Sequence, residues 1–153
     1  MKRLILIAAA IITAVMVSST AMAVGTNTMT VTASVTGVCK FSATTSTLAF
    51  GALDASVATA ATATTGVNFW CTKGTTYSVA DDSGLYNSGG PRMRHATVLT
   101  EFIPYSIVYG AAGTGSGKNT AITLTVDGTI ANADYVDAQA GAYSDTVVLT
   151  VNP

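Results

Sequence analysis

An alternating segment near the start of the chain, residues 28–35 (TMTVTASV), constrains the fold more than any other stretch. Apolar residues occupy one face and Thr or Ser the other, which is the two-residue period of a β-strand. Only Gly37 separates this segment from the next apolar stretch, so no turn signal folds it back to pair there. Left unpaired, such a strand is an open edge prone to aggregation. Its apolar residues are Met29, Val31, Ala33 and Val35.

The first 23 residues are typical of a secretory signal peptide. Lys2 and Arg3 precede an apolar run of 14 residues, and Ala21-Met22-Ala23 is a small-x-small cleavage signal. The run is shorter than the ~18–20 residues that span a bilayer. We therefore expect cleavage before Val24 and export from the cytoplasm, leaving about 130 residues, the size of one domain. Residues 24–36 are then an N-terminal strand, and residues 37–153 are the domain.

The composition favours an all-β structure. Thr and Val are frequent and favour strands, and no long 3.6-residue apolar period follows residue 23. Without Lys2 and Arg3, five of the seven basic residues remain against eight acidic ones, a net charge of −3. This balance lacks the basic footprint of a nucleic-acid-binding protein. Thirteen charged residues in about 130 is also low against a typical ~25%, which suggests that part of the surface is covered.

The two cysteines, Cys39 and Cys71, are expected to form a structural disulfide. In an exported chain a disulfide is the default for a cysteine pair. Two cysteines and one distant histidine are too few for a zinc site, and the spacing is not that of a CxxC motif.

Short segments with strand character recur along the chain, separated by Gly, Asp, Asn and Ser. About seven or eight of them predict an immunoglobulin-like β-sandwich. Residues 54–65 are expected to form a loop or a weak edge, and residues 73–75 a connection of hairpin size. The predicted strands are 28–35, 38–43, 47–51, 66–72, 76–82, 102–110, 120–130 and 143–151.

The last predicted strand suggests that the sandwich is incomplete. Val147, Leu149 and Val151 share one face, and the strand is entered through a Gly-x-Tyr-x-Asp sequence common before a late strand of such sandwiches. If it is the penultimate strand, a groove lined by core residues stays open beside it. The N-terminal strand of a second molecule would fill that groove, which gives a head-to-tail filament. The alternative is that residues 28–35 pair within their own sandwich.

No residues in the sequence support an enzyme, and no cofactor is expected. His95 is the only histidine and is expected to be a solvated surface residue. The segment 113–119 (GTGSGKN) lacks the spacing and the Ser or Thr after Lys of a phosphate-binding loop, so a flexible loop is expected. The segment 92–95 could form a small basic patch or a solvated loop. The carboxylates that could contribute to a calcium site, but that are more typical of turns, are Asp81, Asp82, Asp134 and Asp137.

Taken together, several motifs resemble the spore coat protein U domain, the subunit fold of archaic chaperone–usher pilins. The alternating stretch ends four residues before Cys39, and the combination of "LAFGALD", the two cysteines and the final motif is fairly specific. The chain departs from the family in residues 131–141, where a Pro-Ala-Gly-Gln-type turn is common. The other motifs are "TLAFGALD" (47–54), "VNFWC" (67–71), "TYSVADDSG" (76–84), Arg92 with Met93, "PYSIVY" (104–109) and "GAYSDTVVLTV" (141–151).

The resemblance implies a structural pilus subunit with an incomplete sandwich completed by donor-strand exchange. A periplasmic chaperone would lend the missing strand until an outer-membrane usher exchanges it for a neighbour's N-terminal segment. Met29, Val31, Ala33 and Val35 would be the donor side chains, Ala33 being small for that role. Val147, Leu149 and Val151 would belong to the strand bordering the groove. The pilus would lie on the cell surface and serve adhesion or biofilm formation. The alternatives are a spore-coat or surface-layer protein and a monomeric secreted binding module.

Overall fold

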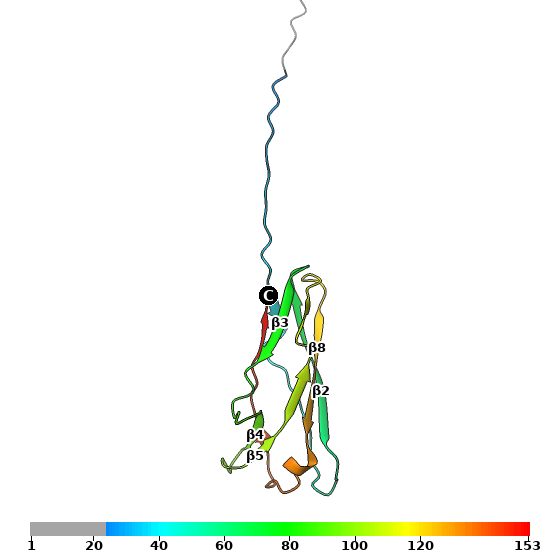
Figure 1. The fold of residues 1–153 in the computed structure, drawn as a ribbon, viewed down its shortest axis with the longest axis vertical. Helices are drawn as coiled ribbons and strands as arrows, with labels where there is room; N and C mark the ends of the chain where they lie inside the picture. The colour runs from blue at the N-terminus through cyan, green and yellow to red at the C-terminus, as the bar shows by residue number, and fades with distance from the viewer. Residues whose placement is uncertain (1–23) are drawn as a thin grey trace, which may run out of the picture. The chain divides into compact units, whose positions relative to one another are not determined.

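The computed structural model describes residues 24–153, so the predicted signal peptide lies outside the described residues. The chain divides into two units, residues 1–33 and residues 34–153. In the described part of the first unit, residues 24–33, no secondary structure is assigned and every residue is exposed. The second unit contains all the strands of the described chain (Figure 1). None of the helical structure in residues 24–153 is long and apolar enough to cross a membrane.

The second unit is all-β, as the sequence predicts, with one short 3-10 helix, η1 (Asn132–Asp134). Its strands form a four-stranded sheet in the order β1-β2-β8-β6 and two three-stranded sheets, β10-β3-β7 and β5-β4-β9. All pairings are antiparallel. The strands are β1 (Cys39–Phe41), β2 (Ala61–Cys71), β3 (Thr76–Asp81), β4 (Arg92–His95), β5 (Phe102–Pro104), β6 (Ser106–Tyr109), β7 (Ala112–Thr114), β8 (Ile122–Ile130), β9 (Tyr143–Ser144) and β10 (Leu149–Asn152).

The long pair β2 and β8 is the backbone of the sandwich. Ala61 faces Ile130 at one end of the ladder and Phe69 faces Ile122 at the other. Alternate residues of β8 are buried, and Thr and Asp lie on its outer face. This alternation is what the sequence pattern predicts for a strand with one face in the core.

Two apolar clusters fill the space between the sheets. The first joins the four-stranded sheet to β10-β3-β7 around Phe69, which is fully buried, with Val79 and Val126. The second joins the same sheet to β5-β4-β9 around Ile103 and Ile130. Because both small sheets pack on one face of the large sheet, the unit is a two-layered sandwich.

The disulfide between Cys39 and Cys71 forms as the sequence predicts. The two residues face each other in the β1–β2 ladder. Cys71 is fully buried in the first cluster, and Cys39 packs against that cluster. The bond therefore fixes the short strand β1 to the end of β2.

Several predicted elements differ in the structure. Residues 54–65 are not a loop throughout, because β2 begins at Ala61 and gains a ladder with β8. Residues 73–75 do not close a hairpin, because β2 and β3 belong to different sheets. The predicted strand 102–110 is divided at Tyr105 into β5 and β6, which join different sheets. The segment 113–119 begins within β7, which pairs with β3, so its first two residues are not a flexible loop.

Candidate functional site

The main feature of the sandwich is an open apolar groove of about 860 Å³. Residues 46–53 line the groove, as do all residues of the segment 142–149 except Thr146 and Val148. We call these two segments the first rim and the second rim. The floor includes Val67 of β2, Ile103 of β5 and Val126 of β8, all of which are buried. The groove thus reaches both apolar clusters along one side of the sandwich.

The first rim has the side chains of a strand but no partner. Leu48, Phe50 and Leu53 line the groove and are half-buried. Among the described residues, the backbone of residues 43–53 makes no backbone–backbone hydrogen bond, and no strand is assigned there. The predicted strand 47–51 is therefore wrong as an assigned element, because a strand exists only where a neighbour supplies its ladder.

The second rim is paired on only one side. The carbonyls of Thr146 and Val148 accept hydrogen bonds from Leu85 and Asp82, respectively. Between them, the backbone N–H and C=O of Val147 have no hydrogen-bond partner among the described residues. In an extended segment, alternate residues direct these groups to opposite sides, so the groups of Val147 are directed away from the paired side.

The structure places the three predicted groove residues on one face of the last segment. Val147 and Leu149 line the groove, and both are half-buried. Val151 lies opposite Val79 in the β10–β3 ladder, where it packs against the first cluster outside the groove lining. Val148, on the other face, is 55% exposed.

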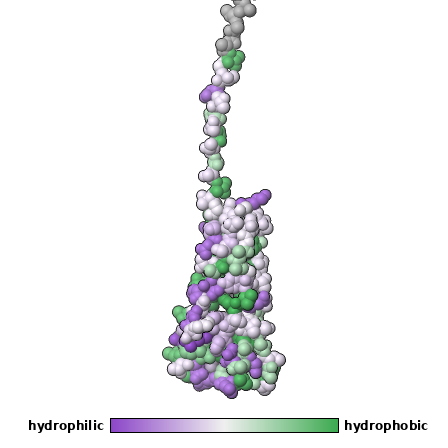
Figure 2. All heavy atoms as spheres, in the orientation of Figure 1, coloured by the Kyte–Doolittle hydropathy of each residue, from purple (hydrophilic) through white to green (hydrophobic). Residues whose placement is uncertain are grey.

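The four predicted donor residues are exposed in this chain. Met29 is 79% exposed, Val31 and Val35 are each 83% exposed, and Ala33 is also exposed. No strand is assigned to residues 28–35. Figure 2 shows hydrophobic residues at intervals along the N-terminal segment. An alternating apolar segment of this exposure is unusual for a soluble monomer.

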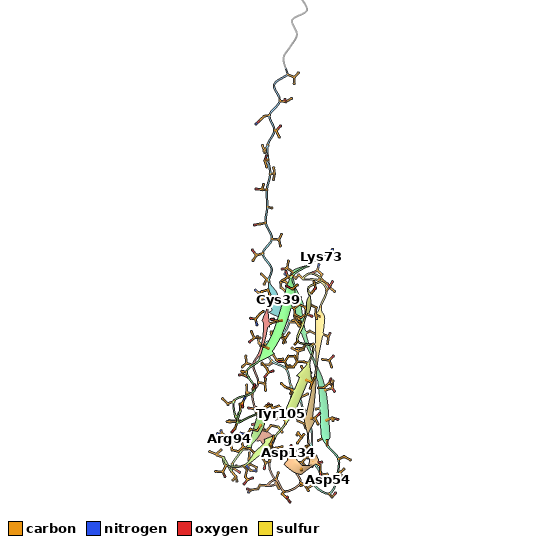
Figure 3. All side chains as sticks on the ribbon, in the orientation of Figure 1. Cys39, Asp54, Lys73, Arg94, Tyr105 and Asp134 are labelled. Carbon is orange, nitrogen blue, oxygen red and sulfur yellow. A yellow bond between two sulfur atoms is a disulfide. The ribbon has the colours of Figure 1, made fainter. Side chains whose placement is uncertain are left out.

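Carboxylates hold the second rim in place, and sequence reasoning missed this role. Asp145 accepts a hydrogen bond from the Tyr105 hydroxyl at 2.8 Å and another from the N–H of Leu85 at 3.0 Å. Burial, reinforced by the hydrogen bond to Asp145, raises the pKa of Tyr105. Figure 3 shows where Tyr105 lies in the sandwich unit. The only sequence signal was the Asp of the "GAYSD" motif.

Two of the four carboxylates considered for calcium, Asp81 and Asp82, accept hydrogen bonds in the turn that follows β3. Asp82 accepts hydrogen bonds from the N–H groups of Val148 and Gly84, which lower its pKa. Asp81 accepts one from Ser83 and another from the Tyr109 hydroxyl, and burial with this bond raises the pKa of Tyr109 to about 12. Across residues 24–153, no group of three or more His, Cys, Asp and Glu is arranged to hold a metal ion.

His95 is buried, and the prediction of a solvated surface residue is wrong. It is only 4% exposed, and its ring stands edge-on to Tyr143 with 4.9 Å between ring centres. Nδ1 accepts hydrogen bonds from the N–H groups of Thr97 and Val98 at 3.1 and 2.9 Å. Nε2 lies 3.3 Å from the carbonyl oxygen of Ala140, to which it donates. His95 therefore fixes the loop that closes one end of the groove.

The segment 92–95, predicted to be either a small basic patch or a solvated loop, forms the strand β4. This does not settle whether its arginines act as a basic patch. The guanidinium of Arg92 lies 3.9 Å from the ring centre of Phe102, and that of Arg94 lies 4.2 Å from that of Tyr86. Arg92 Nε also donates to the carbonyl oxygen of Tyr86. Both arginines are half-buried against aromatic rings. Their side chains are therefore more restricted than those of a solvated loop.

Comparison with known proteins places this geometry in a family. Among solved structures, the chain is similar to one in the crystal structure of the CsuC-CsuE chaperone-tip adhesion subunit pre-assembly complex from archaic chaperone-usher Csu pili of Acinetobacter baumannii. The identity is 19% and the TM-score 0.48, over 76% of this chain and 40% of that chain. No curated protein matches the chain. The family model described as Spore Coat Protein U domain matches residues 25–150, so the resemblance found in the sequence is confirmed and the chain belongs to the Spore Coat Protein U domain family.

Proposed function

We propose that this chain is a structural pilus subunit that polymerises head-to-tail by donor-strand exchange. The N-terminal segment of one molecule would lie in the groove of the next, with Met29, Val31, Ala33 and Val35 directed to its floor. The observation that carries the proposal is the groove itself, which combines an apolar floor with a rim whose backbone, residues 43–53, has no backbone partner.

An inserted strand satisfies both features at once. Its backbone would form ladders with the two rims, and its alternate side chains would cover the apolar floor. The donor segment has the matching two-residue period and is exposed in this chain. Each buried Met or Val side chain would contribute roughly 1.5–3 kcal/mol. Donor and acceptor are different surfaces, so the contact repeats without closing and forms a filament.

The proposed partners follow from the hazard that an open groove presents. Before assembly, an exposed apolar groove with unpaired backbone would promote aggregation. A periplasmic chaperone that fills the groove with its own strand would prevent this, and an outer-membrane usher would exchange that strand for the next subunit's segment. The filament would then lie on the cell surface, where we propose a role in adhesion or biofilm formation and no catalytic role.

The test compares protein purified from the cell surface with a variant lacking residues 24–35. Both are run on SDS gels with and without boiling. We expect the full-length protein to give a ladder of oligomers that collapses on boiling, and the variant to give none. A monomer from the full-length protein, with an insoluble or unfolded variant, would mean that the segment pairs within its own sandwich and would overturn the proposal.

A further inference from the structure

The two ends of the sandwich unit carry opposite charge. Its long axis follows β2, whose 11 residues extend about 36 Å at ~3.3 Å per residue. The loops after Cys71 and before Ile122 lie at one end, and the loops before Ala61 and after Ile130 lie at the other. Figure 3 shows Lys73 at the first end and Asp54 and Asp134 at the second. We call these the basic end and the acidic end.

The basic end is formed by three lysines grouped around Trp70. Lys40 faces Trp70 in the β1–β2 ladder, and Lys118 Nζ lies 6.0 Å from the centre of the Trp70 ring. Lys73 lies beside Gly117, the neighbour of Lys118. All three lysines are exposed, and residues 36–42, 68–78 and 112–122 contain no Asp or Glu.

The acidic end is formed by Asp54, Asp134 and Asp137. Residues 51–61 and 130–142 contain no Lys or Arg. The two loops are tied together, because Asn132 Nδ2 donates to the carbonyl oxygen of Val57 at 2.7 Å. Asp54 accepts hydrogen bonds from the hydroxyl and the N–H of Ser56, which lower its pKa and keep it ionised. These two loops therefore carry three carboxylates and no lysine or arginine. Arg94 of β4, which Figure 3 also shows toward this end, has its guanidinium over the Tyr86 ring.

We propose that the basic end of one subunit packs against the acidic end of the next copy of this chain. The inference rests on the proposed function, because donor-strand exchange brings the ends together. The N-terminal segment leaves the sandwich unit at the basic end, where Val38 N–H donates to Thr72 Oγ1 at 3.1 Å and Thr72 N–H donates to the carbonyl oxygen of Val38 at 2.9 Å. Only Thr36 and Gly37 separate Val35 from this anchor. If Val35 lies in the groove of the next subunit, the sandwich units of the two subunits must therefore touch.

The direction of the inserted segment decides which ends meet. If its last residues emerged at the acceptor's basic end, two basic ends would face each other and their lysines would repel. If they emerge at the acidic end, opposite charges meet and every subunit repeats the same contact, so the filament can grow. The attraction acts over about one Debye length, ~8 Å at physiological salt, and weakens as salt rises.

The test uses filaments of the mature chain and a zero-length carbodiimide cross-linker, which joins only amines and carboxylates in contact. We expect cross-linked peptides that join Lys73 or Lys118 to Asp54, Asp134 or Asp137, identified by mass spectrometry after proteolysis. Because these residues lie at opposite ends of one subunit, such a cross-link connects two subunits. The yield should fall at least threefold in 1 M NaCl and be lost in a Lys73→Gln, Lys118→Gln variant.

A matched control replaces Asp127→Asn, which removes an exposed carboxylate on the middle of β8. That variant should retain the end-to-end cross-links at full yield. Filaments that form, with their heat-sensitive ladder, but give no cross-links between the ends would overturn this inference and leave the proposed function intact. Failure to form filaments at all would overturn the proposed function and this inference with it.

Discussion

Replacing Val31→Asp should abolish polymerisation, and the size of the effect follows from the groove. Val31 is 83% exposed in the chain, so nearly its whole side chain would be transferred from water to the groove floor, worth roughly 1.5–3 kcal/mol. An aspartate loses this burial free energy, and its carboxylate must also be removed from water. The groove lining contains no Lys or Arg to pair with it and contains Asp145, which would repel it.

The aspartate would therefore enter the groove protonated or not at all. Raising a carboxyl pKa by about three units at neutral pH costs about 4 kcal/mol. With the lost apolar burial, the total is about 6 kcal/mol per subunit junction. Every 1.4 kcal/mol is a tenfold change, so the equilibrium for insertion should weaken by about 10⁴-fold.

The matched control is Thr30→Asp, which adds the same charge one residue earlier. Because strand residues alternate, Thr30 would face away from the floor and its aspartate would remain in water. We expect the Thr30→Asp protein to form the heat-sensitive ladder on SDS gels and the Val31→Asp protein to run as a monomer with an unchanged disulfide. Equal ladders from the two variants, or loss of the ladder from both, would refute the assignment of alternate residues to the groove floor.

Four further predictions concern the sandwich itself. Replacing Cys39 and Cys71 by Ser, which opens a link between residues 32 apart, should lower the free energy of unfolding by about 3–4 kcal/mol in denaturant titrations, and an unchanged midpoint would contradict a stabilising role. His95→Ala leaves two N–H groups and a carbonyl unpaired beside a cavity, so its thermal midpoint should fall by an amount equivalent to about 2–4 kcal/mol, and a shift under 1 kcal/mol would count against the buried role. The lowered pKa of Asp82 means that its ionised form adds stability above pH ~4 that is lost as the pH falls through this pKa, so Asp82→Asn should lose less stability than the native chain between about pH 5 and pH 2. Because the pKa of Tyr109 is about 12, its neutral form adds stability that is lost as the pH rises from 10 through that value, and Tyr109→Phe should remove one late-titrating phenol from the ultraviolet titration.

The side-chain pattern predicts strand faces well but cannot show where a strand finds its partner. In β8 and in residues 147–151 the alternation of the sequence matches the burial of each residue. Residues 47–51 have the same character, and Leu48 and Phe50 do point to the core, yet the segment has no ladder. A backbone partner is a tertiary property, and here the neighbour is missing from the described chain. The alternating residues 147–151 therefore suffice to suggest a groove. The sequence does not show that the first rim lacks a backbone partner.

The sequence contains a sign that His95 is buried, but the arginines around it obscure that sign. Arg92 and Arg94 suggest a solvated segment, but residues two apart in a strand share a face, so His95 lies on the face of Met93, which packs against the second cluster. Reading the two-residue period through the charged residues would have placed His95 inward. What the sequence could not supply is its three backbone partners, which come from the turn at Thr97 and from a loop more than 40 residues away.

The outer face of the large sheet carries little charge, which bears on the proposed contact between the ends of two subunits. On that face, Thr64 Oγ1 donates to Asp127 at 2.7 Å and Thr123 Oγ1 donates to Asn68 at 2.7 Å, so cross-strand pairs stabilise the ladder through hydroxyl groups. Asp127 is the one charged residue of β2 and β8. Because these long strands are nearly uncharged, they add little charge between the lysines at one end and the carboxylates at the other. If the proposed end-to-end contact forms, approaching subunits would be oriented by it, and the rate of assembly, like the cross-linking yield, should fall as salt is raised.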